Sequence, residues 1–188
     1  MKKLKQLFLI SIIIVFALPS CKKGENDPFL SLRSRKARLT GEWELKAGTI
    51  TYTDNSGSET MTFNGTTATS PEGTYPYTEK WSIKKDGSFE LSNNDDGHIS
   101  TTKGYWSFGD KVKGMDLKNK ESVIFRVTSE TYVYNGNINI ETYTGTSCPV
   151  YTFNIIELKN KVMAIKVEGT DTWSTNFDSN SGTMTFNQ

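Results

Sequence analysis

From Thr40 to the end of the chain, apolar and polar side chains alternate with a period of two residues. The first stretch shows the pattern clearly, because Trp43 and Leu45 fall on one face while Glu44 and Lys46 fall on the other. Successive side chains of a β-strand point to opposite faces, whereas a helix repeats every 3.6 residues. The pattern therefore predicts half-buried strands over most of the chain.

Clusters of glycine, asparagine, aspartate and proline divide this region at regular intervals. We expect eight to ten strands, drawn from residues 40–53, 60–69, 75–83, 88–91, 98–108, 122–127, 131–134, 138–143, 150–158, 162–167, 173–177 and 183–186, with polar loops at 93–97 and 178–182. Short turns without interleaved helices exclude a parallel α/β fold and favour an antiparallel up-and-down meander. Such a meander removes its edges by closing into a β-barrel, with a β-sandwich as the alternative.

The segment before the strands predicts one short helix, over residues 28–39. Asp27 supplies an N-cap carboxylate, and Pro28 suits the first helical position. Four basic residues follow late in the helix, where the dipole favours cations: Arg33, Arg35, Lys36 and Arg38. They are equally compatible with a solvated helix end and with a surface that lies against anionic lipid headgroups.

The first 20 residues have the parts of a secretory signal peptide. Three lysines precede the apolar run Leu7–Leu18, which a Pro-Ser pair and Cys21 follow. As a helix this run spans roughly 18 Å, which is too short for the ~30 Å hydrocarbon core of a bilayer. We therefore expect residues 1–20 to be removed, residues 21–27 to form a flexible tether, and residues 28–188 to form one domain.

The sequence Leu18-Pro19-Ser20-Cys21 resembles a bacterial lipobox. The resemblance implies that Cys21 becomes the first residue of the mature protein and carries acyl chains such as palmitate. Two or more acyl chains hold a protein stably on a membrane. We therefore expect a lipoprotein of the cell envelope, anchored to the outer membrane on either its periplasmic or its surface face.

Gly41-Glu42-Trp43 begins the first predicted strand, directly after the predicted helix, and resembles the Gly-x-Trp signature of lipocalins. The segments 81–89, 104–108 and 155–165 complete a resemblance to the lipocalin-like lipoproteins of the Bacteroidetes. The resemblance implies a barrel that Gly41 and Trp43 help to close at one end, with a small apolar ligand inside. It also implies a cation packed on the tryptophan ring, for which Arg38, Arg126 or a lysine is available.

The composition excludes several classes of function. The formal net charge of +1 becomes about −2 without the three leader lysines, so no basic surface argues for nucleic acid. The single histidine, His98, is expected at an exposed loop edge, and the chain offers no set of zinc ligands. With Cys21 acylated, Cys148 is expected to be a small buried side chain without a disulfide partner. No catalytic or cofactor motif is found, so we do not expect an enzyme.

Glu79 is the most informative polar residue, because the alternation places it on the same face as Tyr77 and Trp81. If that face lines the lumen, Glu79 is a polar anchor in a pocket; otherwise it reaches solvent at a strand end or is reversed by a bulge. Three further tyrosines complete the candidate lining residues: Tyr105, Tyr132 and Tyr134. The same aromatic side chains would also suit a filled barrel.

Two functions are compatible with these features. A ligand-binding lipoprotein that carries or sequesters a small apolar molecule predicts an open apolar lumen. A non-catalytic structural or interaction subunit of an outer-membrane protein assembly predicts a filled barrel and an exposed apolar patch. The lipocalin resemblance favours the first.

Overall fold

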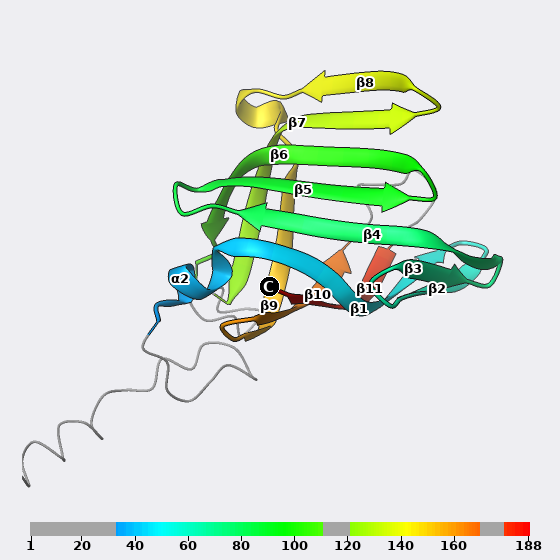
Figure 1. The fold of residues 1–188 in the computed structure, drawn as a ribbon, viewed down its shortest axis with the longest axis horizontal. Helices are drawn as coiled ribbons and strands as arrows, with labels where there is room; N and C mark the ends of the chain where they lie inside the picture. Colours follow the sequence, from blue (N-terminus) through cyan, green and yellow to red (C-terminus); the bar gives the residue numbers. More distant parts are fainter. Residues whose placement is uncertain (1–32, 111–120, 170–178) are drawn as a thin grey trace, which may run out of the picture.

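The computed structural model describes residues 33–110, 121–169 and 179–188. These residues form one short helix, α2 (Arg35–Leu39), and eleven antiparallel strands (Figure 1). The strands are β1 (Gly41–Asp54), β2 (Gly57–Phe63), β3 (Thr67–Ser70), β4 (Gly73–Ile83), β5 (Ser88–Asp95), β6 (His98–Phe108), β7 (Ser122–Tyr134), β8 (Asn137–Thr142), β9 (Val150–Leu158), β10 (Val162–Gly169) and β11 (Ser179–Asn187), with a 3₁₀ turn, η2 (Gly145–Ser147), between β8 and β9. The prediction of an all-β antiparallel fold is confirmed.

Ten of the described strands close into a lipocalin-like β-barrel. The sheet runs β6-β5-β4-β3-β2-β1-β11-β10-β9-β7, and the pairing of β6 with β7 joins its two ends. β7 has two partners on its other side, because residues 122–126 pair with β9 and residues 129–134 pair with the extra strand β8. Closure gives each barrel strand two neighbours, so the structure is the predicted barrel and not the alternative sandwich.

The two ends of the barrel differ in their strands, since α2 lies at one end and the β2–β3 hairpin at the other (Figure 1). There β1 pairs directly with β4 over residues 41–44, whereas farther along it pairs with β2. The hairpin of β2 and β3 therefore widens only the opposite end. The barrel has one narrow end beside the helix and one wide end.

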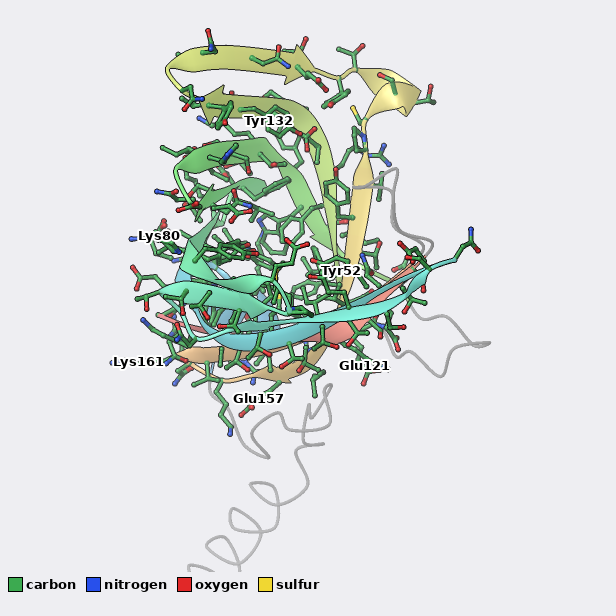
Figure 2. The ribbon with its side chains drawn as sticks, turned by 90° about the vertical axis from the view of Figure 1, so that its right-hand side faces the viewer. Tyr52, Lys80, Glu121, Tyr132, Glu157 and Lys161 are labelled. Carbon is green, nitrogen blue, oxygen red and sulfur yellow. The ribbon has the colours of Figure 1, made fainter. Side chains whose placement is uncertain are left out.

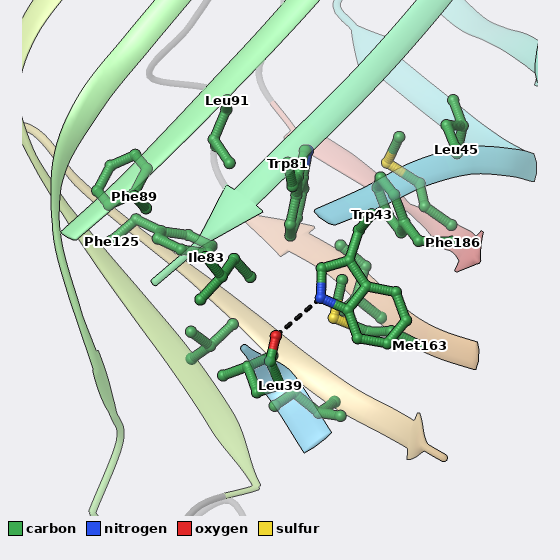
Figure 3. Packing of buried hydrophobic residues seen from close by; sticks show 14 of the residues in the cluster. Leu39, Trp43, Leu45, Trp81, Ile83, Phe89, Leu91, Phe125, Met163 and Phe186 are labelled. Carbon is green, nitrogen blue, oxygen red and sulfur yellow. Dashed lines mark hydrogen bonds between the residues drawn. The ribbon is translucent and has the colours of Figure 1, made fainter. Parts of the chain in front are cut away.

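Trp43 connects α2 to the narrow end of the barrel (Figure 3). Its side chain is fully buried, and its Nε1–H donates to the carbonyl oxygen of Leu39 at 2.7 Å. Gly41 begins β1 with a φ of +153°, which residues with a side chain rarely adopt. Arg38, one candidate for the cation near this ring, is buried at the same end, and its Nη1 donates to the carbonyl oxygen of Leu158 at 2.7 Å.

The observed helix is shorter than predicted within the described chain. Ser34 is its N-cap, since the Ser34 Oγ accepts the N–H of Ala37 at 3.1 Å. The predicted N-cap, Asp27, lies outside the described residues. Arg35 and Arg38 are buried, so the interpretation of the basic residues as one exposed surface is wrong for these two. No helix in the described ranges is long and apolar enough to cross a membrane.

The alternation along the strands places one apolar core inside the barrel (Figure 3). Trp81 lies among aromatic rings, with the ring centroids of Phe125, Phe153 and Phe186 at 5.5, 5.4 and 4.5 Å from its own. Apart from Trp81, Phe125 and Phe186, the large side chains that are fully buried are Leu39, Trp43, Leu45, Ile83, Val123, Val127, Leu158, Met163 and Ile165. This burial of apolar surface is the main stabilising term of the fold. Cys148 is buried and unpaired, as predicted.

Two predicted boundaries within the first half of the barrel are wrong. The predicted strand 60–69 is two strands, β2 and β3, because a turn separates them. Asn64 makes this turn, since its Oδ1 accepts the N–H groups of Thr66 and Thr67 at 3.1 and 2.9 Å. The predicted loop 93–97 is strand as far as Asp95, because the backbone of residues 93–95 pairs with that of β6.

Two predicted gaps in the second half are strand. Residues 128–130 continue β7, and a bulge shifts the register there, since Lys103 pairs with Ser129 but Gly104 pairs with Val127. Residues 179–182 belong to β11, which hydrogen-bonds to β1 on one side and β10 on the other. The predicted strand 173–177 lies outside the described residues. The bulge matters for the site, because it reverses which β7 side chains face inward.

Candidate functional site

The wide end of the barrel holds a cavity of about 230 Å³. Residues from eight strands surround it, so the cavity lies inside the barrel; one of them, Tyr52, is labelled in Figure 2. Its lining residues are Ile50, Tyr52, Phe63, Tyr77, Glu79, Trp81, Leu91, Ser92, Asn93, Ser100, Thr102, Phe153, Val167, Asn180 and Met184. Apolar and aromatic side chains with a few polar groups among them are the usual lining of a small-molecule site.

Glu79 contributes a carboxyl group to this cavity from β4. The hydroxyl of Tyr77 donates to its Oε2 at 2.8 Å, and the Nε1–H of Trp81 donates to its Oε1 at 2.5 Å. Removal from water raises the pKa of the Glu79 carboxyl above its ordinary value of 4.5, while the two hydrogen bonds oppose the rise because they stabilise the charged form. Burial and the negative charge of Glu79 raise the pKa of the Tyr77 hydroxyl.

The local structure of β4 and β5 fixes the orientation of Glu79. Glu79 pairs with Asn93 of β5, and opposite residues of an antiparallel pair share a face, so both side chains reach the cavity. The Tyr77 ring packs on Phe63, with ring centroids 4.8 Å apart, and Trp81 is held in the aromatic core. Both hydrogen-bond donors to Glu79 are therefore positioned before any ligand arrives.

The structure brings together three of the six candidate lining residues. Tyr77, Glu79 and Trp81 all line the cavity. Tyr105 does not, because it alternates with the buried Trp106 along β6 and points away from the barrel, with 62% of its surface exposed. This position corrects the expectation that Tyr105 contributes to the lumen.

Tyr132 and Tyr134 lie on the inner face of the sheet but beyond the cavity. Tyr132 pairs with Ser100, a lining residue, and Tyr134 stacks on His98 with ring centroids 3.9 Å apart. At this point β7 has left β9 and pairs with β8, as Figure 2 shows for Tyr132. The two tyrosines are 42% and 51% exposed, so the expectation that they line the pocket is also corrected. His98 is exposed, as predicted.

A second carboxylate, which the sequence pattern did not single out, lies beside the cavity. Glu130 of β7 is only 6% exposed and pairs with Thr102, a lining residue. The hydroxyls of Tyr132 and Tyr143 donate to its Oε2 at 3.1 and 2.8 Å, and that of Tyr151 donates to its Oε1 at 3.4 Å. Burial and this carboxylate raise the pKa of Tyr132 to about 12. The β7 bulge turns Glu130 inward, against the alternation of the preceding residues.

Comparison with protein-family models found none that matches the chain, and comparison with curated proteins found no match.

In the described part of the chain, no group of three or more His, Cys, Asp or Glu side chains is placed to hold a metal ion. What the site can do follows from its own geometry. Its walls can remove apolar surface from water, and Glu79 can accept hydrogen bonds or pair with a positive charge.

Proposed function

We propose that this protein is a membrane-anchored lipoprotein whose lipocalin-like barrel binds a small molecule with an apolar body. The cavity inside the wide end of the barrel carries the proposal. Its volume of about 230 Å³ exceeds the ~150 Å³ of an engineered apolar cavity that binds benzene, and is below the ~300 Å³ at which drug-sized sites begin. The ligand should therefore be compact, with one or two rings or an equivalent short chain.

The test of ligand binding is native mass spectrometry of the full chain, purified in mild detergent from its own host. We expect a reproducible added mass that corresponds to one small molecule per chain. Leu91→Trp fills the cavity from β5 and should abolish the added mass, whereas Glu90→Gln on the outer face of the same strand should keep it. Wild-type protein with no added mass, before and after incubation with host extract, would contradict the proposal.

Membrane anchoring rests on the sequence, because Cys21 lies outside the described residues. The charged head, the short apolar run and the lipobox-like Cys21 together support acylation at this cysteine. Cys21→Ala should move the protein out of the membrane fraction. A variant that stays in the membrane fraction, together with a wild-type protein whose mass shows no lipid, would contradict anchoring through Cys21.

One observation supports the alternative role as an interaction subunit. Ile138 and Ile140 of β8 are 66% and 63% exposed, and β8 ends the sheet in the described chain. Ile99 of β6, 44% exposed, lies on the same outer face, because it pairs with Val133, which pairs with Ile138. An apolar face beside a free strand edge is typical of sites that bind another protein. Replacing both β8 isoleucines with lysine should then abolish co-purification of an envelope protein.

A further inference from the structure

We propose that the ligand of the barrel cavity is a small organic cation, an ammonium group on a compact apolar body, with its positive charge against Glu79. The proposal rests on the proposed ligand-binding function and adds the chemical class of the ligand. Charge, hydrogen-bonding capacity and wall composition of the cavity each support it.

The charge of the lining selects against anions. Among the described residues that line the cavity, Glu79 is the only one with an acidic or basic side chain. A ligand carboxylate, such as that of a fatty acid, would face this carboxylate with no cation to pair with, and unpaired buried charges are costly. An ammonium group would instead form a charge-assisted hydrogen bond with a carboxyl group that the barrel shields from water, where such bonds are strong.

Glu79 has hydrogen-bonding capacity left for a ligand. A carboxylate accepts about four hydrogen bonds, and each oxygen of Glu79 accepts one, from Tyr77 or from Trp81. In the described ranges, no lysine, arginine or histidine forms an ion pair with Glu79, while exposed carboxylates such as Glu44 and Glu90 pair with lysines. A ligand ammonium would thus supply the partner that the surrounding strands do not.

The walls suit the rest of such a ligand. Five aromatic side chains line the cavity: Tyr52, Phe63, Tyr77, Trp81 and Phe153. The faces of aromatic rings attract cations, and their area buries an apolar body. Tyr77 and Trp81 lie on both sides of Glu79 along β4, so two of these rings line the cavity next to the carboxylate. The cavity therefore combines an acidic side chain with aromatic walls, and aromatic residues are typical of sites for organic ammonium ions.

The experiment compares three probes that share a phenyl ring and a short chain but differ in charge: 2-phenylethylammonium, 2-phenylethanol and phenylacetate. The full chain, purified in maltoside detergent, is titrated with each probe by calorimetry at neutral pH. We expect 2-phenylethylammonium to bind at least about tenfold more tightly than 2-phenylethanol, and phenylacetate to bind more weakly than both. This ranking in the wild-type protein decides the question even if no variant folds.

Two variants locate the selectivity. Glu79→Gln removes the charge in the cavity. It should lower the affinity for 2-phenylethylammonium by about tenfold or more, while changing the affinity for 2-phenylethanol by less than about threefold. Glu90→Gln removes the same charge from the outer face of β5, where Glu90 pairs with Lys103, and should leave all three affinities unchanged. An ammonium probe that binds no better than the alcohol, or that is indifferent to Glu79→Gln, overturns the proposal.

The outcomes also separate this proposal from the proposed function. Binding of 2-phenylethanol without preference for the ammonium probe overturns the cation class and leaves a ligand-binding cavity. If none of the three probes binds, the cation class is also overturned. The ligand-binding function itself fails only if, in addition, native mass spectrometry of the protein from its own host shows no bound small molecule.

Discussion

Replacement of Trp43 by phenylalanine tests how α2 closes the narrow end of the barrel. The Nε1–H of Trp43 donates to the Leu39 carbonyl at 2.7 Å, and neither residue has exposed surface. Phenylalanine removes this donor from a buried carbonyl, which costs about 1–3 kcal/mol. The smaller ring also leaves a gap, which adds roughly 1 kcal/mol. We therefore expect the free energy of unfolding to fall by about 2–4 kcal/mol in Trp43→Phe.

The assay is urea unfolding followed by circular dichroism, which does not depend on tryptophan fluorescence. Tyr105→Phe on the exposed outer face of β6 is the control and should change the free energy of unfolding by less than about 0.5 kcal/mol. Trp43 does not line the cavity, so Trp43→Phe should keep the ligand affinity of the wild type. A loss of stability no greater than that of the control would refute the buried hydrogen bond and its role in closing the barrel.

Three further predictions concern the wide end and the sheet. The raised pKa of Glu79 means that the folded state holds this proton more tightly than the unfolded state, so the contribution of Glu79 to the free energy of unfolding should fall as pH rises above about 4.5. The Glu79→Gln variant should lack this contribution. If the free energies of unfolding of the wild type and the variant, measured in urea, change in parallel with pH, the prediction is contradicted. Gly104→Ala places a methyl group against the carbonyl oxygen of Arg126 and should cost about 1–3 kcal/mol; an unchanged melting temperature would argue against the β6–β7 pairing. Asn64→Ala should cost about 1 kcal/mol by removing the acceptor in the β2–β3 turn, to be checked by thermal unfolding.

The sequence predicts best what depends on alternation within one strand. Glu79 lies on the same face as Tyr77 and Trp81 because residues two apart share a face, and β4 has no bulge between them. The prediction for Tyr105 is wrong, and the same alternation shows why: of two adjacent strand residues only one points inward, and here it is the buried Trp106. The facing of side chains within a regular strand is therefore available from sequence.

Features that depend on pairing between strands could not be predicted. The register shift between β6 and β7 turns Glu130 and Tyr132 inward, and nothing in the residues of β7 alone signals it. The split of β7 between β9 and β8 likewise leaves Tyr134 exposed on the inner face. Whether the lumen is open or filled depends on how side chains from eight strands fit together. Alternation gives their direction but not the volume that they leave.

The central claim, that the barrel contains a cavity able to hold a small apolar body, is tested most directly by a crystal structure determined under xenon pressure. Xenon occupies apolar protein cavities, so the anomalous signal locates them without knowledge of the natural ligand. We expect a xenon atom, or a ligand retained from the host, inside the wide end in contact with Phe63, Trp81 and Phe153. A barrel with no xenon or ligand there, and with its side chains occupying the space, would contradict the claim.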